Sequence, residues 1–347
     1  MSRRRTPALV ATTLLTVGLA ACSTDTAPAT WSPPAEPSAT ATPGPGAPGP
    51  GAPGPGAPGP GAPGPGAPGP GAPGRRAPEQ PFAVGVRQLP LNRDGDRPLP
   101  VTLWYPARGE AGGAAGRSAA VAEGRFPVVV FSHGLSARPA DYAALLTRWA
   151  AAGFVVAAPT FPHTGRGSAQ VNPLDVLNQP ADVSYVLTEV LRLDERAGDP
   201  LRGRLATDRV AAAGHSAGGV TTIGLFTAGR DERLAAGVVL AGTTLGVGSA
   251  FAGSAAPQLF VHGHLDEVVD YAAGRAAYDR VPWPKAMLSL PRGDHGRALL
   301  SDTASLRVVA DTTVGFLHWS LYGDEAARGR LPVDAARGGL ATLDDRL

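Results

Sequence analysis

The sequence lacks the features of several large classes of protein. It has one cysteine, Cys22, so no disulfide bond can form within the chain. Basic and acidic residues nearly balance, to a net charge of +2, and no stretch interleaves basic with aromatic side chains, so nothing indicates a nucleic-acid partner. The apolar stretch over residues 7–21 is too short for a comfortable transmembrane helix. The composition differs from one segment of the chain to the next, and these differences indicate how the chain is organised.

The start of the chain is typical of an exported protein. The start at residues 2–5, Ser-Arg-Arg-Arg, is basic and precedes the uncharged apolar stretch, which predicts a secretory signal peptide over residues 1–21. Residues 19–22, Leu-Ala-Ala-Cys, resemble a bacterial lipobox, and the resemblance implies attachment of a diacylglyceryl group to Cys22 and cleavage before it. The alternative is an ordinary signal peptide with an incidental cysteine. A lone exported thiol otherwise has little structural purpose. The export route stays open, because the arginine run is not followed by the usual apolar pair of a twin-arginine signal.

A low-complexity segment follows Cys22. Residues 24–43 are rich in Ala, Thr, Ser and Pro, and residues 44–74 repeat Pro-Gly-Pro-Gly-Ala without the strict glycine spacing of collagen. No side chain here can build a core, so we predict a disordered tether over residues 22–81. Together with the lipobox, the tether predicts an exported lipoprotein anchored to the outer face of the bacterial cell membrane. Residues 82–347 are then the folded, catalytic domain.

The folded part alternates short apolar runs with amphipathic stretches. Strands are predicted at Ala83 to Leu89, Leu99 to Tyr105, Pro127 to Ser132, Phe154 to Ala158, Val210 to Ala213, Gly237 to Ala241, Gln258 to His262 and Ala286 to Leu290. Helices are predicted at Pro139 to Ala152, Ala181 to Leu193, Ala217 to Phe226, Tyr271 to Tyr278 and Ser305 to Leu321.

This alternation predicts one α/β domain with a doubly wound, mostly parallel sheet and helices on both faces. The strands are rich in Val, Ile, Leu and Ala without clean alternation, which suits a sheet covered on both sides. Its functional site should lie at the carboxyl ends of the strands. Residues 111–116 are predicted to be a flexible surface loop, and residues 331–347 a peripheral helix or a frayed tail.

The most informative motif is Gly-His-Ser-Ala-Gly over residues 214–218. It follows the apolar run at 210–213 and opens the small, apolar stretch at 219–226, so it reads as a strand, a tight turn and a helix with Ser216 at the apex. Such a turn exposes a serine hydroxyl and directs a helix N-terminus at whatever the hydroxyl attacks. The flanking glycines suit positions where a side chain would collide with a neighbouring strand or helix. Ser216 is therefore the candidate nucleophile.

A nucleophilic serine needs a histidine base and an acid that orients it, and in this architecture the acid and then the histidine follow the serine in sequence. Of the seven histidines, His295 has the expected order and lies in a polar loop after a strand. The others are assigned different roles: His133 and His163 precede the serine, His215 is expected to point away from the base, His262 and His264 are strand and turn residues, and His318 packs in a helix.

The acid is expected at Asp266, just past the carboxyl end of the strand at 258–262. Asp270 is better suited to capping the next helix, and Asp294 to shaping the loop that carries His295; Glu267 is a further competitor. The backbone N–H groups of Ala217 and of Leu135, which follows the Gly134 turn, are expected to form the oxyanion hole.

These residues resemble those of the α/β-hydrolase superfamily. A narrower resemblance is to the dienelactone-hydrolase-like group that includes platelet-activating-factor acetylhydrolases and polyester hydrolases. The segments that carry it lie at Leu99 to Pro106, Phe131 to Ser136, Ala151 to Pro159, Gln179 to Val183 and Gly214 to Gly219. The resemblance covers nearly the whole folded part, from about Phe82 to Tyr322. It implies hydrolysis of carboxylic esters without a metal or organic cofactor. Ala217 departs from the acetylhydrolases, which often carry a bulky residue there, so no specific lipid substrate follows.

The sequence thus predicts a serine hydrolase that acts on a small-molecule or lipid-like ester through an acyl-enzyme. Within enzymes, the same residues would also suit a polyester, a lactone, a thioester or an amide. Outside enzymes, the alternative is a surface-tethered binding lipoprotein on a hydrolase scaffold, because a fold does not dictate a function. The loop over residues 161–180 either lines the substrate pocket or is a solvated connection.

Overall fold

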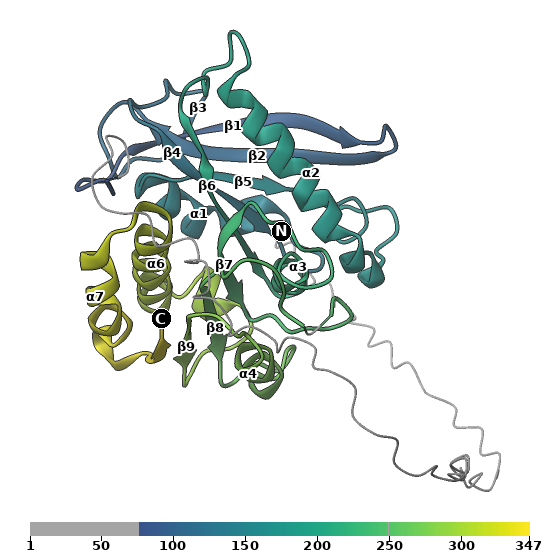
Figure 1. The fold of residues 1–347 in the computed structure, drawn as a ribbon, viewed down its shortest axis with the longest axis vertical. Helices are drawn as coiled ribbons and strands as arrows, with labels where there is room; N and C mark the ends of the chain where they lie inside the picture. Colours follow the sequence, from purple (N-terminus) through teal and green to yellow (C-terminus); the bar gives the residue numbers. More distant parts are fainter. Residues whose placement is uncertain (1–75, 249) are drawn as a thin grey trace, which may run out of the picture. The chain divides into compact units, whose positions relative to one another are not determined.

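The computed structural model describes residues 76–248 and 250–347, drawn in colour in Figure 1. The expected signal peptide, Cys22 and most of the expected tether lie outside the described residues. Within the described tether segment, Ala77 packs against the core of the domain. In these ranges no helix combines the length and the apolar character that a bilayer crossing would need.

The described residues form a ten-stranded sheet in the order β10-β9-β8-β7-β6-β4-β5-β2-β1-β3. The neighbours from β5 to β9 run parallel, whereas β2 is antiparallel to both β1 and β5, and β10 is antiparallel to β9. The strands are β1 (Ala83–Arg93), β2 (Arg97–Ala107), β3 (Gly116–Arg117), β4 (Phe126–Ser132), β5 (Val155–Pro159), β6 (Leu205–His215), β7 (Leu234–Leu240), β8 (Gln258–Gly263), β9 (Lys285–Leu290) and β10 (Thr342–Arg346).

Helices cover both faces of the sheet (Figure 1). The α-helices are α1 (Ala143–Ala151), α2 (Gln179–Leu191), α3 (Ala217–Gly224), α4 (Tyr271–Asp279), α5 (Arg297–Leu300), α6 (Thr303–Leu317) and α7 (Glu325–Ala335). The shorter helical segments are η1 (Pro139–Tyr142), η2 (Pro173–Leu177), η3 (Arg192–Asp194), η4 (His318–Tyr322) and η5 (Arg337–Gly339). Helices α1, α6 and α7 pack on one face, and α2, α3 and α4 on the other.

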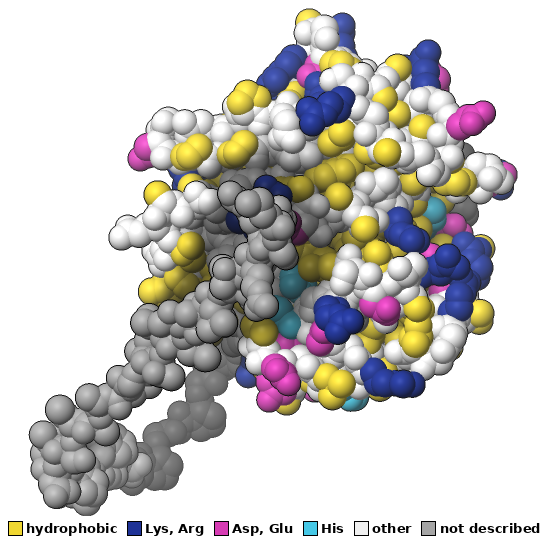
Figure 2. Space-filling view, turned by 180° about the vertical axis from the view of Figure 1, so that it is seen from behind, with side chains coloured by type: hydrophobic (Ala, Val, Ile, Leu, Met, Phe, Trp, Pro, Cys, Tyr) yellow, Lys and Arg dark blue, Asp and Glu magenta, His cyan; other side chains and the backbone are white. Residues whose placement is uncertain are grey.

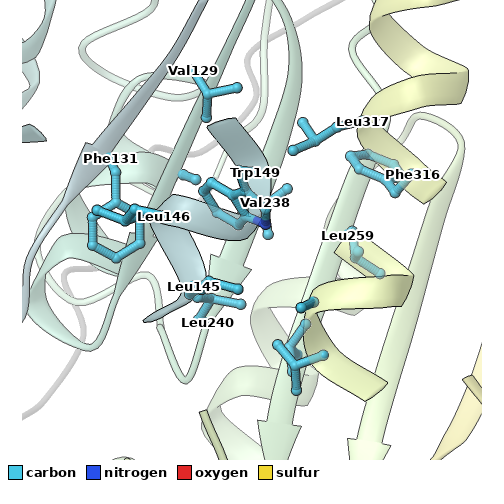
Figure 3. Close-up of a cluster of buried hydrophobic side chains, with 14 of the residues drawn as sticks. Val129, Phe131, Leu145, Leu146, Trp149, Val238, Leu240, Leu259, Phe316 and Leu317 are labelled. Carbon is cyan, nitrogen blue, oxygen red and sulfur yellow. The ribbon is translucent and has the colours of Figure 1, made fainter. Parts of the chain in front are cut away.

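The central strands supply both cores because alternate residues point to opposite faces. Val129 and Phe131 of β4 face α1 and α6, whereas Val128 and Val130 face α2. On the first face, the ring of Trp149 is fully buried, and its indole N–H donates to Thr313 Oγ1 at 2.9 Å (Figure 3). That bond satisfies the one polar group of the indole, so the largest core side chain carries no unpaired donor.

The doubly wound, mostly parallel sheet predicted from the sequence is confirmed, and all eight predicted strands are present. The prediction for residues 331–347 is wrong in its second half, because residues 342–346 form β10, which pairs with β9 at the sheet edge. Its sequence Thr-Leu-Asp-Asp-Arg has one apolar residue, so no alternating pattern marks it as a strand. Charged side chains are tolerated there because an edge strand faces solvent. The predicted loop at 111–116 is exposed except at its end, where Gly116 begins β3.

Candidate active site

Ser216 occupies a strained turn between β6 and α3. Its backbone has φ 56° and ψ −120°, a conformation that a residue with a side chain adopts only when its surroundings impose it. The two glycines of the motif allow this close packing. A Cβ atom at Gly214 would overlap the carbonyl oxygen of Gly218, and one at Gly218 would overlap the carbonyl oxygen of Ser132 in β4. The turn therefore presents the hydroxyl at the carboxyl edge of the sheet.

Three side chains from separate loops meet at this edge. His295 Nε2 lies 2.9 Å from Ser216 Oγ, and His295 Nδ1 lies 2.8 Å from Asp266 Oδ2. Asp266 follows β8 and His295 follows β9, and the carboxyl ends of parallel strands lie at one edge of a sheet. The sequence positions 216, 266 and 295 are distant, but the fold joins their side chains in one hydrogen-bonded chain.

The carboxylate of Asp266 is held on both oxygens. Oδ1 accepts the backbone N–H groups of Val268 at 2.9 Å and Val269 at 2.8 Å, while Oδ2 faces His295. Burial, the largest influence, raises the pKa of Asp266, but the hydrogen bonds from His295 and from the two amides outweigh it, so the pKa is lowered overall. Because the ionised carboxylate can only accept, His295 carries its proton on Nδ1, and Nε2 is free to accept the Ser216 hydroxyl proton.

The two expected oxyanion donors flank Ser216. Ala217 is the first residue of α3, where a helix leaves its N–H groups without an intrahelical partner. The Gly134–Leu135 turn lies against the serine, since a Cβ at Gly134 would be 3.2 Å from Ser216 Cβ. Within the described ranges, the Leu135 N–H donates to no other group. Both amides are therefore close to the hydroxyl that would attack a carbonyl carbon, where they could bind the negatively charged carbonyl oxygen.

His215 is where the sequence interpretation fails. It was expected to point away from the base, but its ring lies 4.9 Å from that of His295, and its Nε2 lies 2.7 Å from the His295 carbonyl oxygen. Its Nδ1 is 2.9 Å from the hydroxyl of Tyr142. Burial lowers the pKa of His215 to about 4, so the ring is neutral at pH 7. The direction of a side chain in a strained turn has no local sequence signal.

His262 has a second contact that the sequence did not reveal. It is a strand residue, as expected, but its Nε2 lies 2.8 Å from the Val269 carbonyl oxygen and 3.3 Å from Asp266 Oδ2. Its ring is buried, and burial lowers its pKa. His262 thus stabilises the loop that carries Asp266. Its position four residues before Asp266, at the end of β8, was the available signal.

The other competitors take the local roles predicted for them. Asp270 accepts the Ala272 N–H at 2.9 Å and caps α4, and Asp294 accepts the Arg297 N–H at 2.7 Å within its loop. His318 is partly buried and lies 2.8 Å from the Ala152 carbonyl oxygen. In the described part of the chain, no group of three or more His, Cys, Asp or Glu side chains is arranged to hold a metal ion.

The loop over residues 161–180 lies beside the Gly134–Leu135 turn. The Ser136 N–H donates to the Thr164 carbonyl oxygen at 2.7 Å, and the Arg166 N–H donates to Ala137 at 2.8 Å. Gln179, fully buried, donates to Thr164 at 2.7 Å and accepts from Thr221 of α3 at 2.5 Å. The loop is therefore fixed to the helix that begins after Ser216.

The sheet order, the strand–turn–helix at Ser216 and the loops at the carboxyl edge define the α/β-hydrolase fold. The family model described as Chlorophyllase matches residues 118–249, a segment that contains Ser216 but ends before Asp266 and His295. No curated protein compared with this chain matches it significantly. The chain therefore has the α/β-hydrolase fold, and the segment around Ser216 is similar to the Chlorophyllase family model.

Proposed function

We propose that the protein is a serine hydrolase that cleaves carboxylic esters through an acyl-enzyme. The observation that carries the proposal is the continuous hydrogen-bonded chain from Asp266 through His295 to Ser216. A binding protein on the same scaffold would have no need to keep these three side chains aligned. The similarity of residues 118–249 to the chlorophyllase family model supports an ester as substrate.

In the proposed reaction, Ser216 Oγ attacks the ester carbonyl carbon while His295 Nε2 takes the hydroxyl proton. The ionised Asp266 stabilises the charged imidazolium, and the N–H groups of Leu135 and Ala217 bind the oxyanion. The C–O bond to the alcohol then breaks, and His295 returns its proton to the leaving alkoxide. Water attacks the acyl-enzyme with His295 again as the base, which releases the acid and regenerates the serine.

Exposed apolar side chains at the carboxyl edge favour an apolar ester. Apart from Val333 on α7, every exposed large hydrophobic side chain of the described residues lies in a connecting segment that follows one of the parallel strands. These side chains, which we call the apolar rim, are Leu135 after β4, Val171, Leu174 and Leu177 after β5, Leu245 after β7, and Leu265 and Val268 after β8. Figure 2 shows hydrophobic side chains gathered beside histidines near the middle of one face. Such exposed clusters favour apolar ligands.

A fluorophosphonate probe tests the nucleophile directly. The wild-type protein should be labelled on Ser216, and the Ser216→Ala variant should not be labelled and should lose about 10⁴- to 10⁶-fold in turnover of a chromogenic ester while staying folded. A folded wild-type protein that resists the probe would support the binding lipoprotein instead.

The leaving group and acyl chain define the substrate class. A panel of chromogenic esters, thioesters, lactones and anilides, together with a polyester suspension, should show esters as the fastest class. Faster turnover of anilides would contradict the ester assignment and favour an amidase.

We further propose that the domain is exported and anchored to the outer face of the bacterial cell membrane by a lipid on Cys22. The support is the lipobox-like sequence before a Pro- and Gly-rich segment. Expression of the full chain in a bacterial host tests this. The wild-type protein should fractionate with membranes, and the Cys22→Ser variant should lose that association; equal fractionation of both would overturn the anchor.

A further inference from the structure

A buried hydrogen-bonded chain links three backbone segments of the candidate active site. The Gly134 N–H donates to the hydroxyl of Tyr142 at 2.9 Å, and this hydroxyl lies 2.9 Å from His215 Nδ1. At the other side of the same ring, His215 Nε2 lies 2.7 Å from the carbonyl oxygen of His295. This hydrogen-bonded chain therefore links the turn that carries Leu135 to the His295 loop, and it passes through His215, the residue before Ser216.

The direction of every hydrogen bond in this chain is determined. The His295 carbonyl oxygen can only accept, so His215 carries its proton on Nε2. A neutral imidazole has one N–H, so Nδ1 must accept, and the Tyr142 hydroxyl must donate to it. The Tyr142 oxygen then accepts the Gly134 N–H. Each donor has an acceptor, and reversing one bond would leave a buried group unpaired.

Burial fixes the protonation states that this direction requires. The side chains of Tyr142 and His215 are 2% and 5% exposed. Burial raises the pKa of the Tyr142 hydroxyl to about 12, so at pH 7 the residue keeps the proton that it donates. The Tyr142 ring is wedged against Phe131 of β4, with ring centroids 4.7 Å apart, which leaves the hydroxyl little freedom.

The chain ends where the proposed reaction needs accurate placement. A Cβ at Gly134 would lie 3.1 Å from the Tyr142 hydroxyl, 3.2 Å from His215 Nδ1 and 3.2 Å from Ser216 Cβ, so these groups meet at one point. An oxyanion donor and a base act only if they are held at the correct distance before the reaction begins. Neither Tyr142 nor His215 needs to touch the substrate to influence that distance.

We propose that Tyr142 and His215 are positioning residues, which hold the Gly134–Leu135 oxyanion turn and the His295 loop at fixed distances from Ser216. The proposal rests on the function proposed above. It assigns to the histidine of the Gly-His-Ser-Ala-Gly motif a role distinct from that of the base.

The Tyr142→Phe variant tests one arm of the chain, because it removes a single hydroxyl and keeps the ring. We expect kcat for a chromogenic ester to fall about 10- to 100-fold, with KM changed by less than about 3-fold, and the rate of fluorophosphonate labelling to fall in parallel. Tyr105→Phe is the matched control. Tyr105 is 1% exposed, and its hydroxyl donates to the Ala119 carbonyl oxygen at 2.9 Å, away from the site. The control should lower Tm and leave kcat unchanged.

Isosteric replacements of His215 separate the two arms. In His215→Asn the amide replaces Nδ1, so the bond to Tyr142 survives and the bond to His295 is lost; in His215→Gln the amide replaces Nε2 and the reverse holds. Both variants should lower kcat. His215→Gln already breaks the bond between Tyr142 and His215, so adding Tyr142→Phe to it removes only the Gly134 bond in addition, and the double variant should lose less in kcat than the product of the two single losses.

The outcomes separate this inference from the proposed function. If the wild-type protein is not labelled on Ser216, both are overturned. If it is labelled, but Tyr142→Phe lowers only Tm and leaves kcat and the labelling rate at wild-type values, the two residues are merely structural. Multiplicative effects of Tyr142→Phe and His215→Gln would equally overturn the linked chain. If Tyr142→Phe fails to fold, the two His215 variants decide the question. An unchanged kcat in both His215→Asn and His215→Gln would overturn the proposal.

Discussion

Arg97 and Asp182 form a two-pronged ion pair, although 85 residues separate them in the chain. Arg97 Nε and Nη2 lie 2.6 Å from the two carboxylate oxygens of Asp182, whose side chain is fully buried. The same guanidinium reaches Asp175 of η2 at 2.7 Å. The hairpin of β1 and β2 is thereby joined to the loop that lies beside the oxyanion turn, and the hydrogen bond to Asp182 is the main reason that the pKa of Arg97 is raised.

Replacing Arg97 with Met should destabilise the domain strongly. The change leaves two buried carboxylates with fewer partners, and removing one member of a buried ion pair costs about 3–5 kcal/mol. Arg93, whose Nη1 is 2.7 Å from Asp182, would retain part of that stability. The free energy of unfolding in urea measures the effect. The exposed ion pairs of Arg337 provide the control, since Arg337→Met should cost less than about 1 kcal/mol. Equal losses for both variants would contradict the assignment.

Asp266→Asn should abolish most activity without unfolding the protein. The amides of Val268 and Val269 hold an oxygen at Oδ1, so the introduced NH₂ group would face His295 Nδ1. His295 would then need its proton on Nε2 and could not accept one from Ser216. We expect kcat to fall about 10³- to 10⁴-fold.

Asp270→Asn is the control for this change. Asp270 lies four residues after Asp266 and caps α4, so its substitution should change Tm slightly and leave kcat unchanged. An Asp266→Asn variant with more than about a tenth of wild-type kcat would exclude Asp266 as the orienting acid.

Gly134→Ala should lower activity through steric pressure on the serine. The added methyl would be 3.2 Å from Ser216 Cβ and 3.1 Å from the Tyr142 hydroxyl, closer than most Cβ atoms approach a neighbour. Steady-state kinetics should show kcat reduced about 10-fold or more. Gly329→Ala, in α7, meets no atom within 4 Å, so it should leave kcat unchanged and stabilise the helix by up to about 1 kcal/mol. Identical kinetics for the two variants would show that the Gly134 turn is not crowded.

The free energy of unfolding should decrease as the pH is lowered, because buried histidines must then take up protons. Burial lowers the pKa of His215 to about 4, and it also lowers the pKa values of His133, His262 and His318. In the unfolded chain a histidine titrates near pH 6.5, so between about pH 6.5 and 4 the unfolded state binds more protons. The free energy of unfolding is therefore fully retained above pH 6.5 and declines below it, by about 3 kcal/mol for His215 alone.

Urea unfolding at pH 7.5 and 4.5 measures this decline. His318→Gln keeps a donor that can reach the Ala152 carbonyl oxygen but cannot titrate, so it should make the curve shallower without affecting activity. A free energy of unfolding that is equal at the two pH values would mean that these rings accept protons without loss of the fold.

The elements and the order of the site residues could be predicted because their signals are local. A glycine on each side of Ser216, an apolar strand before it and an acid just past a later strand are each readable over a few residues. The Arg97–Asp182 pair has no such signal, since its members contribute nothing to each other's local pattern. The side-chain direction of His215 depends on a turn whose φ is 56° at the next residue, and strand β10 depends on pairing with β9. Each of these was set by contacts between distant segments.

The apolar rim should select long acyl chains. Leu174 and Leu177 are 73% and 48% exposed, and Leu177 also contacts the Gly246 position beside Leu245, so the rim is continuous across two loops. A bound acyl chain that covers such a leucine gains about 1.5–3 kcal/mol at full burial. The Leu174→Ser, Leu177→Ser double variant should therefore lower kcat/KM for a decanoyl ester about 10-fold or more, while an acetyl ester, which has no alkyl chain to cover these leucines, is hydrolysed as by the wild type. Val333→Ser, equally exposed on α7, should affect neither ester. Equal losses for both esters would place the acyl chain elsewhere.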